Sequence, residues 1–391
     1  MYRIQTLNKI APEGLSRFSL DNYEIASEIS NPDAIVVRSF KMNEMQFGSS
    51  LLAIARAGAG VNNIPVDKCS EAGIVVFNTP GANANAVKEL VLAGMLISSR
   101  KIIEGINWAK SLADKGEDVS KQVEQGKSQF VGPEIFGKTL GVIGLGAIGH
   151  LVANAAEKLG MNVIGYDPYL SVDSAWGLSQ NVQKAKGLDH LLSESDYITL
   201  HVPLVDATRE FIDRSKFQIM KDGVRILNFA RGGLLKQADL IAALDSGKVS
   251  RFITDFPDAE LVKHEKVIPV PHLGASTPES ETNCAVMAVN QLKDYIENGV
   301  IRNSVNFPET DMSRNGGTRL CIVNQNIPKM VGQITTVLAN EDINIDDMLN
   351  RHRDNLAYNI IDVNQKITDK QIEVIKGIKG VIRVRVITSE K

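Results

Sequence analysis

Four side chains of types that carry out acid–base chemistry follow apolar runs in the second half of the chain. Arg231 lies in "NFARGG", Asp255 ends "RFITD", Glu260 lies in the loop after it, and His272 follows "VIPVP". A histidine exchanges a proton with a hydroxyl or carbonyl oxygen, a carboxylate fixes its tautomer, and an arginine binds a carboxylate through two hydrogen bonds. Taken singly, each is better explained as a surface ion pair or a core side chain.

The motif "GLGAIG", residues 144–149, follows the apolar run "TLGVI" and precedes a helical pattern. In this context Gly144 permits a tight turn, Gly146 lets the backbone approach a pyrophosphate, and Gly149 allows close packing of helix and strand. Asp167, after the next strand "NVIGY", can accept hydrogen bonds from ribose hydroxyls. A 2′-phosphate would meet like charge there, so the motif predicts NAD rather than NADP, with a purely structural glycine turn as the alternative.

The carboxyl ends of parallel strands share one edge of a sheet, where ligands bind. The four residues and the glycine motif together therefore predict oxidation of a 2-hydroxy acid by hydride transfer to NAD. No serine or cysteine lies in a nucleophile elbow, which disfavours nucleophilic catalysis.

The composition predicts a soluble globular protein of two or three domains. The chain has 391 residues, 43% hydrophobic and 23% charged, with a formal net charge of -3, which argues against a dedicated nucleic-acid binder. Cys69, Cys284 and Cys321 lack metal-binding spacing, which predicts reduced thiols in a cytoplasmic protein and no metal site. No long uncharged apolar run or export signal is visible, so we expect no membrane span and no export.

Short apolar runs alternate with helical patterns, which predicts an α/β fold with two doubly wound parallel-sheet domains and a smaller C-terminal domain. The first, residues 1–92, is expected to bind the substrate and to be completed by a helix over residues 277–300. The NAD-binding domain is expected over residues 93–276, a linker over 301–317 and a βαββαβ unit over 318–391. A single long helix is expected over residues 85–112.

The motifs "GLGAIG", "NFARGG", "TDFPDAE" and "PHLGAST", with Asp167, resemble those of the D-isomer-specific 2-hydroxyacid dehydrogenases. The resemblance covers nearly the whole chain. "RAGAGVNNI" and "NTPGANANAVKEL" are most similar to the members that oxidise 3-phosphoglycerate in L-serine synthesis, and the C-terminal segment resembles an ACT regulatory domain.

The resemblance implies a role for each site residue. Arg231 would bind the substrate carboxylate and keto oxygen, Glu260 would pair with the imidazole, and His272 would be the acid–base group. The implied cofactor contacts are Gly144, Gly146, Ala147, Ile148, Gly149, Asp167, Val202, Pro203, Phe229, Ala230, Arg231, Asp255, His272, Gly274 and Ala275. The implied substrate contacts are Arg38, Ser39, Lys41 and Arg56 for the phosphate and Ala57, Gly58, Ala59 and Gly60 for the carboxylate, with Lys41 equally explained as a solvated surface charge.

The sequence departs from the family pattern near the predicted catalytic glutamate. Leu261 stands where proline usually follows that glutamate, and the interval from Glu260 to His272 is shorter than usual, so Glu265 remains a rival partner for His272. Asn63 stands where aspartate is common.

The C-terminal segment is similar to serine-binding ACT domains through Asn324, Asn326 and Asn344, although Lys329 stands where glycine is usual. A structural or oligomerising role is the alternative to L-serine binding. The resemblance also implies a homodimer or homotetramer that uses the region of residues 90–130. Two other functions stay open: another D-2-hydroxy acid such as 2-hydroxyglutarate as the substrate, and a non-catalytic NAD(H)-sensing regulator.

Overall fold

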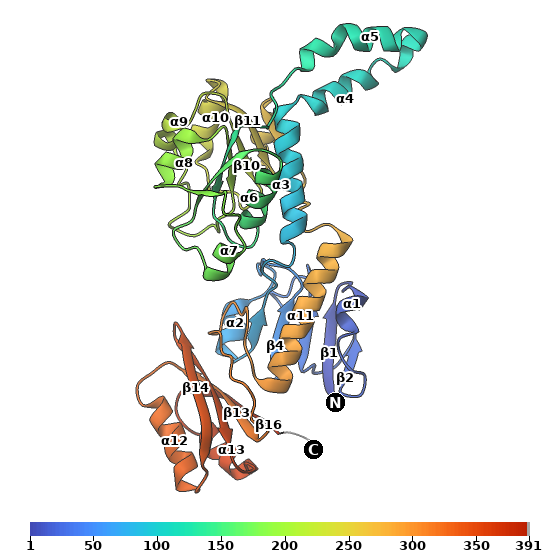
Figure 1. Cartoon of the computed structure of the whole chain (residues 1–391). Coiled ribbons are helices and arrows are strands. Elements are labelled where there is room, and N and C mark those ends of the chain that lie inside the picture. The colour runs from blue at the N-terminus through green and yellow to red at the C-terminus, as the bar shows by residue number, and fades with distance from the viewer. Residues whose placement is uncertain (389–391) are drawn as a thin grey trace. The chain divides into compact units, whose positions relative to one another are not determined.

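The chain divides into two compact units in the computed structural model, which describes residues 1–388 (Figure 1). The first unit comprises Met1–Ala82 and Pro278–Lys391, and the second comprises Asn83–Thr277. Helix α3 (Ala84–Ser99) packs its buried apolar side chains into a core of the second unit. The domain boundary expected between residues 92 and 93 therefore falls inside α3.

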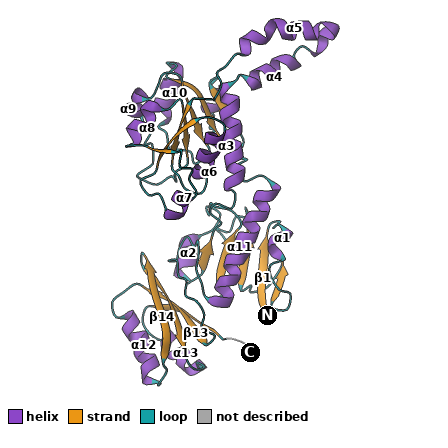
Figure 2. Cartoon of the chain, viewed as in Figure 1, coloured by secondary structure: helices purple, strands orange, loops and turns teal. Residues whose placement is uncertain are grey.

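The first unit contains a parallel five-stranded sheet with the strand order β2-β1-β3-β4-β5. Figure 2 shows its strands in orange and the helices α1, α2 and α11 in purple. Its central strand β3 is buried at every position, as expected for a strand covered on both faces. Alternate residues of β3 enter two different cores, one with α11 and one with Cys69 of α2. The elements are β1 (Tyr2–Leu7), α1 (Pro12–Leu15), β2 (Tyr23–Ala26), β3 (Ala34–Val37), β4 (Ala53–Arg56), α2 (Val66–Glu71), β5 (Val75–Phe77) and α11 (Pro278–Asn298).

The second unit contains a parallel seven-stranded sheet with the strand order β12-β11-β10-β9-β6-β7-β8. The chain builds β6, β7 and β8 outward and then crosses to β9 on the other side of β6, so the order reverses between β6 and β9. Such a reversal is where parallel sheets bind ligands. The elements are β6 (Thr139–Ile143), α6 (Gly149–Lys158), β7 (Asn162–Tyr166), α7 (Val172–Trp176), β8 (Gln183–Lys184), α8 (Leu188–Glu194), β9 (Tyr197–Leu200), α9 (Arg214–Ile219), β10 (Val224–Asn228), α10 (Gln237–Asp245), β11 (Val249–Thr254), the 3-10 helix η3 (Leu261–Lys263) and β12 (Val267–Pro269).

A helical arm, residues 102–130, follows α3 in the second unit. The single helix expected over residues 85–112 is interrupted at Arg100, whose backbone is extended. The hydroxyls of Ser98 and Ser99 both donate to the carbonyl of Met95 at 2.8 Å, and such side-chain bonds compete with helix continuation. The arm contains α4 (Ile102–Lys110), η1 (Ala113–Asp118), α5 (Val119–Gly126) and η2 (Lys127–Phe130), and α4 and α5 contain no buried residue.

The C-terminal part of the first unit is an antiparallel four-stranded sheet with the order β14-β15-β13-β16. Helices α12 and α13 share a core with this sheet. Other sheet residues, among them Tyr358 and Ile360, belong to the same core as α11. The elements are β13 (Thr318–Gln325), α12 (Met330–Asn340), β14 (Ile345–Arg353), β15 (Leu356–Val363), α13 (Asp369–Lys376) and β16 (Val381–Ile387).

Side chains from the C-terminal part bind the last carbonyl groups of α11, and we call this contact the α11 cap. A helix leaves its last carbonyls without partners inside the helix, and they carry partial negative charge. Five consecutive carbonyls accept hydrogen bonds here: those of Tyr295 and Ile296 from Arg385, that of Glu297 from Arg314, that of Asn298 from Arg319, and that of Gly299 from the Tyr358 hydroxyl. The C-terminal sheet is therefore joined to α11 by polar as well as apolar contacts.

The segment expected to be a linker packs against β5. The Asn306 side chain accepts from the backbone N–H of Val76 at 2.9 Å and donates to the carbonyl of Ile74 at 2.9 Å. Arg314 of the α11 cap also lies in this segment. Residues 301–317 are thus fixed by hydrogen bonds to the first unit.

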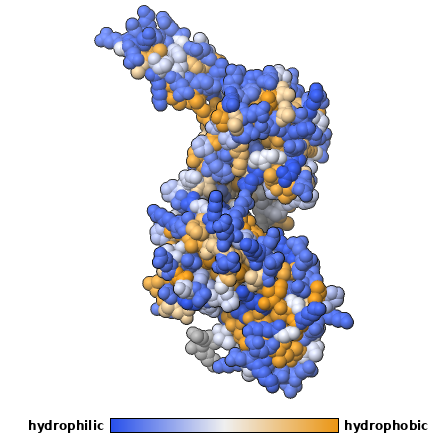
Figure 3. All heavy atoms as spheres, turned by 180° about the vertical axis from the view of Figure 1, so that it is seen from behind, coloured by the Kyte–Doolittle hydropathy of each residue, from blue (hydrophilic) through white to orange (hydrophobic). Residues whose placement is uncertain are grey.

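The predicted fold class, two parallel α/β sheets followed by a βαββαβ unit, is confirmed. Hydrophilic residues cover much of the face shown in Figure 3, with apolar residues interspersed among them. None of the helices within residues 1–388 has both the length and the apolar character that crossing a bilayer requires.

Candidate functional site

A glycine-rich turn joins β6 to α6 at the carboxyl edge of the second sheet. Gly144 has a φ of 90°, and a Cβ atom added to it would lie 2.5 Å from the carbonyl oxygen of His201. A Cβ on Gly149 would lie 1.9 Å from the Gly144 carbonyl oxygen, whereas a Cβ on Gly146 would meet nothing within 4 Å. The first and third glycines are therefore required by packing, and the second leaves the backbone open to a bound group.

The N-terminus of α6 follows this turn, after Ala147 and Ile148. Unpaired N–H groups at a helix N-terminus favour a bound anion such as a pyrophosphate. His201, which was not among the predicted site residues, lies beside Gly149. Burial lowers the pKa of His201 to about 4, so its imidazole is neutral at physiological pH and the turn attracts anions through its backbone.

Asp167 lies at the end of β7, next to the glycine turn. One carboxylate oxygen accepts from the backbone N–H of Leu145 at 2.9 Å, and the other accepts from that of Tyr169 at 2.8 Å. Each oxygen retains a further lone pair. The carboxylate is therefore fixed at the strand end with acceptor capacity left for hydroxyl donors.

The remaining predicted cofactor contacts follow the neighbouring strands at the same edge. Val202 and Pro203 come after β9, and Phe229 and Ala230 come directly after β10. Gly274, in the loop after β12, is buried, and an added Cβ would lie 3.1 Å from the Val87 side chain. Ala275 follows it in the same loop. The sheet thus brings the predicted NAD residues to one edge.

His272 lies beside Asp255, with 3.9 Å between imidazole Nδ1 and carboxylate Oδ2. The Asp255 side chain is 2% exposed and that of His272 is 60% exposed, so the imidazole is open to a ligand while the carboxylate is buried. The Phe256 ring contacts the imidazole edge-on at 4.8 Å between centroids. Burial raises the pKa of Asp255, and the nearby His272 and Arg231 partly offset this effect.

The second carboxylate oxygen of Asp255 is an orphan acceptor. Its Oδ1 atom is buried and has no hydrogen-bond partner within residues 1–388. A buried acceptor without a donor is costly unless a ligand supplies one. The atom is therefore placed to accept from a ligand N–H group.

Arg231 follows β10 and is exposed, with Nη1 donating to the Ala230 carbonyl at 2.7 Å. Its backbone is fixed by Asn228, whose side chain donates to the Arg231 carbonyl at 2.8 Å and accepts from the Ala230 N–H at 3.2 Å. Asn228 was not among the predicted site residues, although its place at the end of a buried strand, just before Arg231, is a signal that the sequence contains.

Glu260, the carboxylate predicted to pair with His272, binds another residue. Its Oε2 atom accepts from the Gln237 side chain at 2.8 Å, and its own backbone N–H donates to Asp258. The rival Glu265 precedes β12, whereas His272 follows that strand, so the two lie toward opposite ends of it. Of the predicted carboxylates, Asp255 is the one that the structure places beside His272.

In the first unit, Arg38 and Ser39 follow β3 and Arg56 ends β4. Arg56 Nε and the Asn63 amide donate to the Arg38 carbonyl at 3.1 and 3.3 Å. Asn8 accepts from the Ser39 N–H at 3.0 Å. These bonds fix the backbone beside Arg38, and neither Asn8 nor Asn63 was predicted to do so.

Lys41 is exposed after the same strand. The loop from Ala57 to Gly60 is fixed separately. The carbonyls of Gly58 and Ala59 accept from the Thr79 N–H at 3.1 Å and the Asn78 amide at 2.6 Å. A Cβ on Gly58 would lie 2.3 Å from the Arg56 guanidinium, so only glycine lets that side chain lie over the loop.

The three predicted effector residues differ in their exposure to solvent. Asn324 is buried, accepts from Asn359 at 2.6 Å and donates to the Gln325 carbonyl at 2.7 Å. Asn326 and Asn344 are exposed. The structure therefore leaves two of the three side chains accessible to a small molecule.

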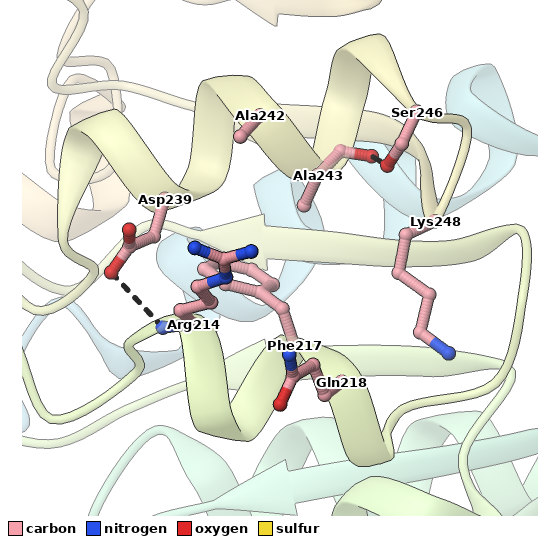
Figure 4. A pocket seen from close by; sticks show the side chains of 8 residues that line it. All are labelled: Arg214, Phe217, Gln218, Asp239, Ala242, Ala243, Ser246 and Lys248. Carbon is pink, nitrogen blue, oxygen red and sulfur yellow. Dashed lines mark hydrogen bonds between the residues drawn. The ribbon is translucent and has the colours of Figure 1, made fainter.

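A cavity of about 480 Å³ lies away from these residues, between α9 and α10 (Figure 4). Its lining includes Arg214 and Asp239, which are joined by a hydrogen bond from the Arg214 backbone N–H at 3.0 Å. None of the predicted site residues lines this cavity. We therefore place the candidate site at the carboxyl edge of the sheet.

Residues 93–274 match the family model described as "D-isomer specific 2-hydroxyacid dehydrogenase, NAD binding domain". The chain is 34% identical over 334 residues to D-3-phosphoglycerate dehydrogenase of Methanocaldococcus jannaschii, covering 83% of this chain and 61% of that protein. It is 36% identical over 303 residues to D-3-phosphoglycerate dehydrogenase of Archaeoglobus fulgidus, covering 74% of this chain and 54% of that protein. The chain thus spans less than two thirds of these relatives.

Two solved structures resemble the chain over 78% of its length, each at 26% identity. One is a glyoxylate reductase from Paecilomyes thermophila, with a TM-score of 0.62 and 98% of that chain covered. The other is an NAD+-bound 3-phosphoglycerate dehydrogenase from Entamoeba histolytica, with a TM-score of 0.60 and 98% of that chain covered.

Proposed function

We propose that the chain is a D-isomer specific 2-hydroxyacid dehydrogenase that oxidises 3-phosphoglycerate to 3-phosphohydroxypyruvate with NAD, because residues 93–274 match the NAD-binding domain of that family and the chain is 34% identical over 334 residues to a D-3-phosphoglycerate dehydrogenase. This reaction opens L-serine synthesis. The observation that carries the proposal is the placement of Arg231, Asp255 and His272 at the edge of a sheet whose first turn fits a dinucleotide.

The residues at this edge fit NAD. The open backbone at Gly146 and the N-terminus of α6 suit the pyrophosphate, and the fixed carboxylate of Asp167 suits the ribose hydroxyls. The orphan Oδ1 atom of Asp255 suits the N–H donors of a carboxamide. When bound, NAD supplies the acceptor for the hydride that leaves the hydroxyl-bearing carbon of the substrate.

His272 accepts the hydroxyl proton of the substrate at its Nε2 atom, because Nδ1 faces Asp255. In the reverse reaction it returns that proton to the keto oxygen. The buried Asp255 carboxylate stabilises the protonated imidazole and fixes the ring tautomer. The family motif gives this role to Glu260, which in this conformation binds Gln237.

The proposal also assigns the substrate contacts. Arg231 binds the substrate carboxylate and keto oxygen through its guanidinium. The backbone of Ala57–Gly60 receives the carboxylate. The phosphate contacts are Arg38, Ser39, Lys41 and Arg56.

We also propose that the chain forms a homodimer or homotetramer in the cytoplasm. The three cysteines are buried and free, which suits a reducing compartment such as the cytoplasm.

The helical arm supports the proposal of an oligomer, because α4 has three exposed isoleucines and no buried residue. Ile102, Ile103 and Ile106 are 41, 39 and 49% exposed. Light scattering after gel filtration measures the subunit number, and replacing residues 102–130 by a short glycine linker should reduce it.

The C-terminal sheet is proposed to be ACT-like, with L-serine as an effector near Asn324, Asn326 and Asn344. Its support is the antiparallel βαββαβ order and the exposure of Asn326 and Asn344. L-serine should lower the initial rate in the assay described next. An unchanged initial rate at millimolar L-serine would contradict the effector role. The C-terminal sheet would then have only the structural role that its contacts with α11 provide.

The experiment that tests the function follows NADH consumption with 3-phosphohydroxypyruvate as the substrate. The purified chain should turn over this substrate faster than 2-oxoglutarate, and His272→Ala should lower turnover by about 10²- to 10⁴-fold while retaining NADH binding. If the chain bound NADH but reduced no 2-oxo acid, the result would favour the NAD(H)-sensing regulator. If it reduced 2-oxoglutarate faster than 3-phosphohydroxypyruvate, the result would favour 2-hydroxyglutarate as the substrate.

A further inference from the structure

Arg38, a proposed phosphate contact, is already paired with a carboxylate of this chain. Its Nη1 atom lies 2.6 Å from Oε1 of Glu281, which lies in the first turn of α11. The Arg38 side chain is 30% exposed and that of Glu281 is 47% exposed. The pair thus lies at the surface of the first unit, where a soluble anion could reach it.

The position of Arg38 does not depend on Glu281 alone. Three bonds fix its backbone: Arg56 and Asn63 bind its carbonyl, and Asn8 binds the next N–H. The backbone from which the Arg38 side chain extends is therefore held independently of Glu281.

Glu281 lies beside Arg38 on helix α11, which is held in place by packing and hydrogen bonds. Neighbouring residues of α11, Ser280, Cys284 and Ala285, are buried against the first unit, and the far end of the helix is bound through the α11 cap. A negative side chain is also favoured at a helix N-terminus. Release of the guanidinium therefore requires rotation of a side chain, that of Glu281 or that of Arg38, rather than movement of α11.

We propose that Glu281 is a selectivity residue that competes with the anionic end of the substrate for Arg38. Its carboxylate takes the position at the guanidinium that a phosphate would need, and a phosphate bound there would meet a neighbouring negative charge. Glu281 therefore disfavours 2-hydroxy and 2-oxo acids with a phosphorylated end relative to those without a charged end. This inference rests on the proposed function, because it takes Arg38 to bind that end.

The test compares Glu281→Gln with the natural chain on 3-phosphohydroxypyruvate and on glyoxylate, which has no distal charged group. The ratio of kcat/KM for the phosphorylated substrate to that for glyoxylate should rise about two- to fivefold, as expected for a partly exposed ion pair. Glu279→Gln, on the same turn of α11, is the matched control and should leave the ratio unchanged. An unchanged ratio in Glu281→Gln would overturn the proposal. A lower ratio would also overturn it, because Glu281 would then help to position Arg38 for the phosphate.

A binding measurement separates this inference from the proposed function. Inorganic phosphate, titrated by calorimetry into each variant, should bind Glu281→Gln about two- to fivefold more tightly than the natural chain. Arg38→Ala should abolish the difference. Equal phosphate affinities of the two chains would contradict the inference even if the enzyme oxidised 3-phosphoglycerate. Tighter phosphate binding by Glu281→Gln, without turnover of any phosphorylated acid, would contradict only the proposed function.

Discussion

At the scale of single residues, the pair of His272 and Asp255 makes the proposed acid–base chemistry testable by substitution. Oxidation requires an imidazole that accepts the hydroxyl proton of the substrate. The buried Asp255 carboxylate lies 3.9 Å from Nδ1 and stabilises the ring once it holds that proton. Asp255→Asn should therefore lower kcat/KM for oxidation by about 10²-fold, measured from NADH formation at fixed pH.

Glu260→Gln provides the comparison for that measurement. Because Glu260 binds Gln237 in this structure, its replacement should lower kcat/KM less than Asp255→Asn does. A larger loss in Glu260→Gln would restore the pairing that the family motif implies. Both rates must be recorded at saturating NAD, since Asp255 is also a proposed cofactor contact.

Lys329 occupies a backbone conformation that favours glycine. Its φ is 72° at the start of α12, and its side chain makes no cap bond. The left-handed region costs a residue with a Cβ roughly 1–2 kcal/mol, while glycine costs roughly 0.5–1 kcal/mol in unfolded-state entropy. Lys329→Gly should raise the free energy of unfolding by roughly 0.5–1 kcal/mol in urea titrations.

Lys329→Ala is the control for that prediction. It keeps the Cβ and therefore the conformational strain, so it should leave the free energy of unfolding nearly unchanged. Stabilisation of equal size in both variants would attribute the effect to the lysine side chain rather than to the backbone.

The sequence predicted the residues whose roles depend on local context. The glycine turn, Asp167 and His272 each follow a recognisable strand, so their place at the sheet edge could be inferred. Asn8, Asn63 and Glu281 could not be found this way, because each acts on a segment distant in sequence.

At the scale of elements, the α11 cap is the contact with the largest predicted effect on stability. Arg385 donates to the carbonyls of Tyr295 and Ile296, and its guanidinium lies 4.3 Å from the centroid of the Tyr295 ring. Arg385→Ala would leave two carbonyls without these donors. We expect the free energy of unfolding to fall by roughly 2–4 kcal/mol, measured in urea on the full chain.

Two further variants test whether the loss of stability comes from the hydrogen bonds of Arg385. Arg385→Lys keeps the charge but cannot reproduce the two-donor fork, so it should give an intermediate loss. Arg351→Ala removes an exposed arginine of β14 and should change the free energy of unfolding by less than about 0.5 kcal/mol. Equal losses in Arg385→Ala and Arg351→Ala would mean that the cap contributes nothing.

Elements with continuous apolar runs can be predicted from the sequence, and those without them cannot. Strands β3, β4 and β5 are buried at nearly every position, so their apolar runs predict buried strands, and the βαββαβ order of the C-terminal part was expected. Strand β1 alternates with polar residues and β8 has only two residues, so neither stood out. The break at Arg100 depends on serine bonds to Met95, which a helical pattern does not reveal.

At the scale of the whole molecule, the C-terminal sheet completes the core of the first unit. Cys321, Val323 and Tyr358 share one apolar cluster with Tyr295 and Ile296 of α11. A chain that ends at residue 317 would expose these α11 side chains and the carbonyls of the α11 cap. Its melting temperature should fall by at least about 5 °C, measured by scanning calorimetry, and an unchanged value would show that the sheet is dispensable for this core.

The first unit is built from two stretches of chain, because Asn83–Thr277 separates the sheet β1–β5 from α11. A ribosome adds roughly 5–20 residues per second, so the five strands wait roughly 10–40 s before the helix that covers them is made. During that time the face that includes Ala34 and Val36 lacks α11, which supplies Ala285, Ala288 and Leu292 to the same core. We expect the nascent chain to rely on a chaperone over this interval, and the second unit to fold before the first.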